Sequence, residues 1–176
     1  MAQSITFRLA DSLPRAVVVD QLAGRTKAQA RERYEGLLDA GYGDKLLSTA
    51  AAAAIVQDAL LHFDGVRYRI HAWCVMPNHV HVLATPMNGV SLSSILHTWK
   101  SFTAKRINAA LGRSGPLWWE EYYDRVIRDA DHFEIVKYYI ENNPVKAGLC
   151  ARPTDWPYSS ARRPDPEKAG ETPAIL

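Results

Sequence analysis

The stretch Trp73-Cys-Val-Met-Pro-Asn-His-Val-His-Val-Leu-Ala84 decides how the chain is expected to fold, because it reads as a β-strand that carries two histidines two residues apart. Side chains alternate between the two faces of a strand, so His79 and His81 point the same way. Along one face they lie about 6 to 7 Å apart, which lets them share a divalent metal if another element adds a further ligand. The pair predicts half of a metal site on the surface of a sheet, although two ordinary strand histidines explain it equally well.

The segments on either side of the histidines predict further strands and helices. Strands are expected over residues 4–9, 66–76, 79–85 and 117–128. Helices are expected over residues 27–38, 48–63, 91–111 and 131–143, and residues 17–22 fit either a helix or a short strand. Asp131 should open the last helix and Pro144 should end it. One face of the second strand should carry Tyr68, Ile70, Ala72, Cys74 and Met76. This order predicts an α+β fold with helices on one face of an antiparallel sheet.

The composition describes an ordinary globular chain. Its 176 residues are 47% hydrophobic and 23% charged, which predicts one domain over residues 1–161 and a flexible tail over residues 162–176. No apolar run approaches the roughly 18 residues that span a membrane, and the first residues lack the pattern of a signal peptide, so we expect a cytoplasmic protein. Cys74 and Cys150 fit neither a disulfide framework nor a zinc motif and are expected to be reduced.

The formal charge of +2 is too small to indicate nucleic-acid binding by itself, so such a function needs a local patch. Residues 97–128 hold six positive and three negative side chains, interleaved with tryptophans and tyrosines. This mixture suits a surface that binds single strands by phosphate contact and base stacking, but a solvated helix over an aromatic core has the same composition. The candidate DNA-binding residues are Lys100, Lys105, Arg106, Arg125, Arg128 and Trp99.

The last helix offers two tyrosine and asparagine pairs, each one helical turn apart. At about 100° per residue, Tyr139 and Asn143 border the apolar stripe that should face the sheet, whereas Tyr138 and Asn142 point away from it. The stripe consists of Phe133, Val136 and Ile140. Only the first pair can border the sheet surface that carries the histidines, although a boundary aromatic and a helix end are the simpler interpretation of that pair alone.

Together these residues suggest phosphodiester chemistry. Two imidazoles and the Asn143 carboxamide oxygen would leave metal positions open for phosphate and water, and mixed nitrogen and oxygen ligands suit Mg²⁺ or Mn²⁺, with Mn²⁺ the better match to imidazole. A tyrosine hydroxyl, with a usual pKa of about 10, is a weak nucleophile at neutral pH, but it can attack a phosphodiester that a metal polarises. The combination predicts an enzyme that nicks and rejoins DNA.

Two blocks of the sequence resemble a known family. Val75-Met-Pro-Asn-His-Val-His-Val-Leu83 and Tyr139-Ile-Glu-Asn-Asn-Pro-Val-Lys-Ala-Gly-Leu149 are similar to the two signature blocks of the REP-associated tyrosine transposases, the single-tyrosine branch of the HUH endonuclease superfamily. Weaker similarities extend over nearly the whole chain. The resemblance implies a ferredoxin-like or RRM-like HUH palm, in which the strand with both histidines faces the tyrosine helix.

The resemblance also implies roles for single residues. Tyr139 would be the catalytic nucleophile that forms a 5′-phosphotyrosine bond with single-stranded DNA and frees a 3′-hydroxyl, and His79, His81 and Asn143 would bind the metal. The family's substrates are DNA hairpins from repetitive extragenic palindromes or transposon ends, and its members are monomers or homodimers. Several relatives open with a Gly-Thr or Gly-Ser aromatic element that reads a guide sequence, and residues 1–7 lack that element.

Two other functions fit parts of the pattern. A zinc-dependent hydrolase would use the histidine pair with His71 or Cys74 as a further ligand, but barrel hydrolases with a His-x-His pair need roughly 250 residues. An RRM-like module that binds nucleic acid without cleaving it would keep the same surface. The presence of Tyr139 together with both histidines argues for cleavage.

Overall fold

The computed structural model describes residues 1–13 and 26–162. Its centre is an antiparallel sheet with the strand order β2-β3-β1-β4. The strands span Gln3–Arg8 (β1), Tyr68–Val75 (β2), His79–Pro86 (β3) and Tyr123–Val126 (β4). All the expected strands are present, with β4 much shorter than expected. The expectations for residues 17–22 and for a flexible tail from residue 163 onward lie outside the described residues.

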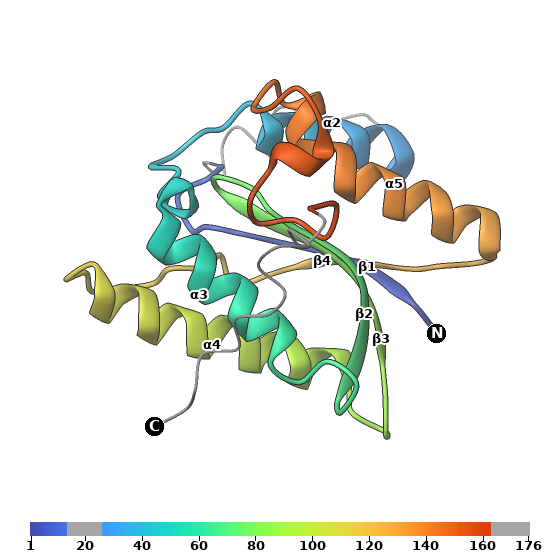
Figure 1. Cartoon of the computed structure of the whole chain (residues 1–176), viewed down its shortest axis with the longest axis horizontal. Coiled ribbons are helices and arrows are strands. Elements are labelled where there is room, and N and C mark those ends of the chain that lie inside the picture. Colours follow the sequence, from blue (N-terminus) through green and yellow to red (C-terminus); the bar gives the residue numbers. More distant parts are fainter. Residues whose placement is uncertain (14–25, 163–176) are drawn as a thin grey trace, which may run out of the picture.

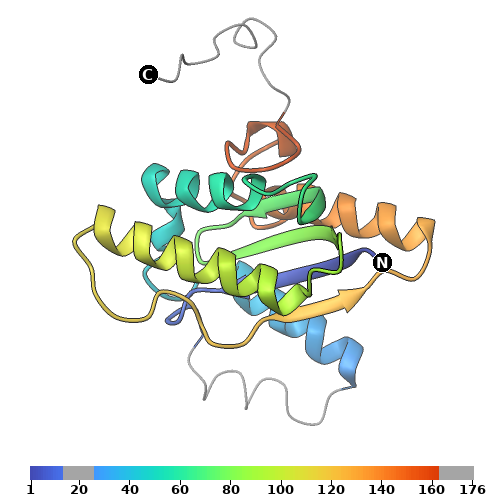
Figure 2. The ribbon, with the colours of Figure 1, turned by 90° about the horizontal axis from the view of Figure 1, so that it is seen from below.

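The helices form two layers, one on each face of the sheet. They span Lys27–Asp39 (α2), Ala50–Leu61 (α3), Leu92–Ala110 (α4) and Ala130–Lys146 (α5), with short 3-10 turns at Leu46–Ser48 (η1) and Pro153–Asp155 (η2). In Figure 1, α2 and α5 lie above the sheet and α3 and α4 below it, and in Figure 2 the α3 and α4 layer lies in front of the sheet. The α+β class and the antiparallel sheet are confirmed, but helices cover both faces rather than one. The six residues from His79 to Ala84 are buried on both faces of β3, which a single helical layer cannot achieve.

A β-bulge in β2 changes which residues share a face. His71 is an extra residue between the pairs that Ile70 and Ala72 form with β3. As a result Tyr68 and Ile70 pack with α3 and α4, while the three later members of the expected set, Ala72, Cys74 and Met76, pack toward α5. The prediction that all five share one face is therefore wrong, because the pattern of alternation is interrupted at a single position.

Helix α5 begins earlier and ends later than expected. Its N-cap is Asp129, whose side chain accepts a hydrogen bond from the His132 amide at 2.7 Å. The helix continues through Pro144, because the following amides still find carbonyl partners, such as the Ala147 amide on the Asn143 carbonyl. It stops before Gly148, whose φ of +71° is the left-handed conformation usual after a helix end. Asn143 thus lies inside the helix and faces inward.

The two edges of the sheet differ. The outer edge of β2 is paired by residues 158–160, through hydrogen bonds between Val75 and Tyr158 and between Trp73 and Ser160. At the other edge β4 is exposed along its whole length. Within residues 1–13 and 26–162, no helix combines the length and the apolar character needed to cross a membrane.

Candidate metal site and nucleophile

The two histidines meet at their ring nitrogens on the face of β3 that α2 and α5 cover. The Nε2 atoms of His79 and His81 are 3.0 Å apart, and the residues are 1% and 2% exposed. We expected a site on the surface of the sheet, but the second helical layer encloses it. Because β3 is an inner strand that pairs with β1 and β2, the backbone that carries both rings is held on both sides.

Hydrogen bonds to the other ring nitrogens orient both imidazoles. The Asn78 side-chain amide donates to the carbonyls of Leu38 and Tyr42, so its oxygen faces His79 Nδ1, at 2.7 Å. That nitrogen therefore carries the proton, and His79 Nε2 presents a lone pair. The Thr6 hydroxyl lies 2.9 Å from His81 Nδ1 and can donate or accept, so it suits either tautomer of His81. Partners of this kind fix the orientation of metal-binding histidines.

The geometry of the pair fits a divalent cation. Two ligand atoms that lie about 2.1 Å from one ion and at a right angle to each other are about 3.0 Å apart, which is the observed separation of the Nε2 atoms. Burial, followed by the neighbouring His81, holds the pKa of His79 well below its usual value. His79 is thus neutral near neutral pH, which is the form that binds a metal.

Asp39, the last residue of α2, supplies an acidic group that the sequence analysis missed. Its Oδ1 lies 3.8 Å from His79 Nε2, and one ligand atom from each of Asp39, His79 and His81 falls within 4.8 Å of the others. Neither carboxylate oxygen has a hydrogen bond, although Oδ2 lies 3.5 Å from Lys146 Nζ. Burial raises the pKa of Asp39, and Lys146 opposes that rise. The feature of the sequence that could have indicated Asp39 is its position as an acidic residue at a helix C-terminus, where the helix dipole disfavours negative charge.

Tyr139 and Asn143 face this group, as the helical geometry predicted. The Tyr139 ring centre is 5.7 Å from that of His81. Asn143 is fully buried, and neither of its amide atoms has a hydrogen bond; the buried Tyr139 hydroxyl also lacks one. Tyr138, by contrast, is 69% exposed. Burial, followed by the acids Glu35 and Asp39, raises the pKa of Tyr139 far above its usual value, so its hydroxyl keeps its proton at neutral pH.

The further ligands that a zinc hydrolase would need are not in place. His71 Nε2 is hydrogen-bonded to the Thr85 hydroxyl, and its ring packs on Phe133. Burial raises the pKa of the Cys74 thiol, so the sulfur stays protonated and is a poor metal ligand. Among the described residues, the group that can hold a metal therefore takes its third member from α2, and neither His71 nor Cys74 belongs to it.

The candidate DNA-binding residues divide between the two layers. Trp99 is 2% exposed and donates its indole N–H to the Tyr68 hydroxyl, so it is a core residue and cannot stack on a base. Lys100 donates to the carbonyls of Trp119 and Glu120, which ties α4 to that segment. Lys105 and Arg106 are exposed on α4, the layer across the sheet from the histidines. These four residues are not brought to the site.

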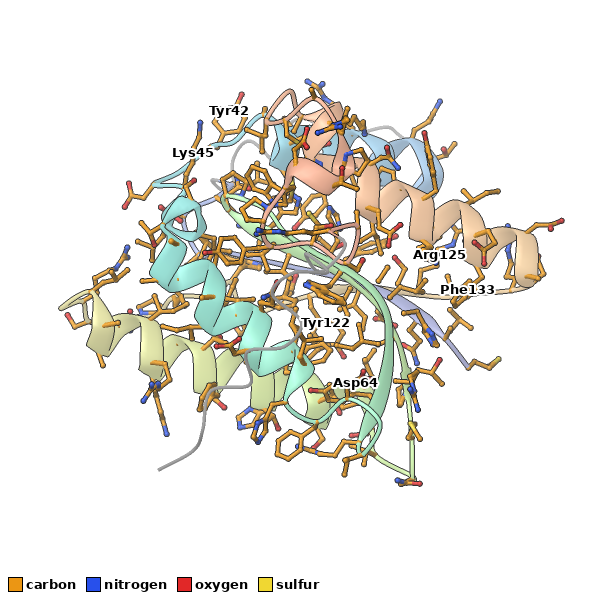
Figure 3. The ribbon with its side chains drawn as sticks, in the orientation of Figure 1. Tyr42, Lys45, Asp64, Tyr122, Arg125 and Phe133 are labelled. Atoms are coloured by element: carbon orange, nitrogen blue, oxygen red, sulfur yellow. The ribbon has the colours of Figure 1, made fainter. Side chains whose placement is uncertain are left out.

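Arg125 lies on the face of the sheet that carries the histidines, and Arg128 follows it between β4 and α5. Arg125 pairs with Ser4 across β1 and β4, and Ser4 is two residues from Thr6, so both point to the face that carries His81. Figure 3 shows Arg125 near Phe133, below α5. Arg128 is exposed between β4 and α5. Arg125 thus places a positive charge on the histidine face, at the uncovered edge of the sheet.

The sequence and the fold are similar to those of known proteins. Residues 51–143 match the profile of the family described as Transposase IS200 like. A REP-associated tyrosine transposase of Escherichia coli (strain K12) is 31% identical over 97 residues, which cover 54% of this chain and 56% of that protein, so the chain spans about half of that relative's length. A solved structure of a REP-associated tyrosine transposase bound to a REP hairpin has a similar fold, with a TM-score of 0.59 and 22% identity over 90% of this chain and 74% of the other. The matched family region contains His79, His81, Tyr139 and Asn143, whereas Asp39 precedes it.

Proposed function

This chain belongs to the IS200-like transposase family, and from that premise we propose that it is a metal-dependent enzyme that cleaves and rejoins single-stranded DNA hairpins. Tyr139 is the proposed nucleophile, and cleavage leaves it joined to the 5′-phosphate of one DNA end. His79 and His81 are the proposed metal ligands, with Asn143 and Asp39 as the further oxygen donors. The solved structure of a REP-associated tyrosine transposase bound to a REP hairpin supports a hairpin as the substrate, either from a repetitive extragenic palindrome or from a transposon end.

The observation that carries this proposal is a cluster of buried polar atoms without hydrogen bonds. The atoms belong to Asp39, Tyr139 and Asn143, and they surround two imidazoles whose Nε2 atoms face each other. Burying such atoms without partners costs folding free energy, at about 1 to 3 kcal/mol for each group. A cluster of them beside a fixed histidine pair is best explained by a ligand that supplies their partners when the protein acts.

The proposed reaction exchanges one phosphodiester bond for another. The Tyr139 hydroxyl oxygen attacks the scissile phosphorus, the bond from phosphorus to the 3′ oxygen breaks, and the tyrosine proton ends on that 3′ oxygen. A bound cation would polarise the phosphate and offset the charge that develops on it. Imidazole ligands favour Mn²⁺ over Mg²⁺ at such a site, and oxygen ligands admit both. Burial, followed by the adjacent acids Glu35 and Asp39, raises the pKa of Tyr139 and so keeps its hydroxyl protonated in the free protein.

The test is formation of a covalent protein–DNA adduct. Labelled hairpins from repeats near the coding region are incubated with the protein and Mn²⁺, and the adduct is seen as a shifted band on a denaturing gel. Tyr139→Phe should abolish the band, because the variant loses the attacking oxygen and keeps the ring. The matched control is Tyr138→Phe, which removes an exposed hydroxyl from the same helix and should retain the band.

Two outcomes would change the assignment. An adduct on Tyr138, found by peptide mapping, would transfer the nucleophile to the opposite face of α5. Hairpin binding without any adduct in the presence of either metal would favour the RRM-like binding module.

A further inference from the structure

A cavity adjoins the histidine pair on the side away from Tyr139. It has a volume of about 240 Å³ and lies between the end of α2, the turn between β2 and β3, and the end of α5. Asp39, Lys45, Asn78, His79 and Ala147 are among its lining residues. His81 and Tyr139 do not line it. The cavity and the tyrosine therefore flank the histidine pair.

The walls of this cavity are held by hydrogen bonds to the turn between β2 and β3. Asn78 donates to the carbonyls of Leu38 and Tyr42, and the Leu47 amide donates to the Pro77 carbonyl. The chain is therefore fixed to this turn on both sides of residues 40–45, at Leu38 and at Leu47, and also within that segment at Tyr42. Figure 3 shows Tyr42 and Lys45 on this segment, between α2 and α3.

Lys45 adopts a backbone conformation that is unfavourable for its residue type. Its φ is +50°, in the left-handed region that non-glycine residues rarely adopt. Asp11 holds the neighbouring backbone, because its carboxylate accepts a hydrogen bond from the Asp44 amide. The end of the Lys45 side chain folds against Gly41, where an added Cβ would lie 3.1 Å from the ammonium nitrogen. Lys45 thus lines the cavity next to Gly41 and adds a positive charge to its wall.

We propose that this cavity is a nucleotide subsite, which holds the nucleoside whose 3′ oxygen leaves, and that Lys45 contacts the phosphate on its 5′ side. This inference rests on the proposed function. In an in-line displacement the attacking and leaving oxygens lie on opposite sides of the phosphorus. If Tyr139 attacks from the His81 side, the leaving 3′ oxygen and its nucleoside lie on the His79 side, where the cavity opens.

The size and charge of the cavity fit this occupant. Its volume is somewhat below the range of about 300 to 1,000 Å³ that is usual for drug-sized ligands, which suits one sugar and base better than a longer strand. A lysine ammonium is a good partner for a phosphate oxygen. Asp39 lines the same cavity, but Lys146, 3.5 Å away, offsets its negative charge, so Lys45 is the charged group of the lining that can contact a phosphate.

The test compares two small nucleotides in the intact protein with Mg²⁺, by NMR titration. Thymidine 3′-monophosphate carries only the phosphate that would lie at the histidines, whereas thymidine 3′,5′-bisphosphate also carries the one assigned to Lys45. Lys45→Ala should weaken binding of the bisphosphate by about five- to tenfold and leave the monophosphate unchanged, because one charged contact is lost. The control Lys137→Ala removes the same charge from α5, outside the cavity, and should change neither affinity.

A second variant tests the cavity itself. Ser48→Leu adds bulk to its exposed rim and should weaken binding of both nucleotides without affecting inorganic phosphate. Equal affinities of the wild type for both nucleotides, or an unchanged bisphosphate affinity in Lys45→Ala, would overturn the subsite while leaving the histidine site in place. Nucleotide binding that is unaffected by His81→Gln would instead contradict the phosphate site at the histidines, and with it the proposed function.

Discussion

The two faces of the sheet bury side chains of opposite character. On the face covered by α3 and α4, the polar atoms of the large aromatics are paired: Trp99 donates to Tyr68, and Tyr68 donates to the Leu60 carbonyl. Trp118 similarly donates to Thr103. The partly buried indole N–H of Trp73 is an exception among the described residues. On the face covered by α2 and α5, the polar atoms of Asp39, Tyr139 and Asn143 are buried without hydrogen bonds.

This difference separates the structural face from the face that carries the proposed site. Paired polar groups in an apolar layer stabilise a unique fold, whereas unpaired ones reduce stability and are retained where a ligand completes them. The single sheet supports both, because alternate residues of β1 and β3 point to opposite layers. In β3, Val80 and Val82 pack into the apolar layer, and His79 and His81 face the other.

The largest expected effect is on stability, from the structural face. Trp99→Ala should lower the free energy of unfolding by about 3 to 5 kcal/mol, because it removes a large buried side chain and leaves the Tyr68 hydroxyl with one partner fewer. The matched change on the other face is Asn143→Leu, which replaces an equally buried side chain by an apolar one of similar size. It should leave that free energy within about 1 kcal/mol of the wild type or raise it. Denaturant titration measures both, and similar losses in the two variants would remove the distinction between the faces.

The second effect concerns the cation. Asp39→Asn should weaken Mn²⁺ binding by about 100-fold, because it removes a carboxylate that lies beside both histidines. The same variant should stabilise the metal-free protein by about 1 kcal/mol, since it removes a buried negative charge at a helix C-terminus. Calorimetric titration and thermal unfolding measure the two quantities. Asp58→Asn, an exposed change on α3, is the control and should alter neither. Unchanged Mn²⁺ affinity in Asp39→Asn would exclude this carboxylate from the site.

The parts of this site that the sequence predicted are those set by local periodicity. The spacing of His79 and His81 in one strand, and of Tyr139 and Asn143 in one helix, fixes which side chains share a face. The bulge at His71 shows where such reasoning fails, because one extra residue reverses the faces of β2. Asp39 could not be predicted, because its place beside His79 depends on how α2 docks on Asn78, a contact between segments that are distant in the chain.

The burial of single side chains was also predicted only in part from the sequence. Trp99 lies among basic residues in the chain, and its neighbours suggested a surface for stacking bases. Its position on the inner side of α4 instead places it in the core. The histidines were expected on the surface of the sheet, but α2 and α5 cover them, because a second helical layer is a property of the whole fold rather than of one segment.

A smaller effect on metal binding should come from Thr6, which orients the proposed metal ligand His81. Thr6→Val removes the hydroxyl next to His81 Nδ1 and keeps a side chain of similar shape. It should weaken Mn²⁺ binding by about tenfold, since the imidazole loses the hydrogen-bond partner that orients its ring. Thr6→Ser keeps the hydroxyl and should restore most of the affinity. Equal affinities of all three proteins, measured by calorimetric titration, would show that the strand alone orients His81.

The smallest expected effect tests which face the DNA follows. Each phosphate contact to a single strand contributes about 0.7 to the slope of the logarithm of affinity against the logarithm of salt concentration. Arg125→Ala with Arg128→Ala should therefore reduce this slope by about 1.4, because Arg125 lies on the histidine face and the exposed Arg128 lies two residues beyond the end of β4. Lys105→Ala with Arg106→Ala removes two positive charges from the α4 layer and should leave the slope unchanged. Fluorescence anisotropy with a labelled hairpin at several salt concentrations measures the slopes. If the α4 pair changes the slope and the arginine pair does not, the DNA runs along the structural face and must cross the sheet edge to reach Tyr139.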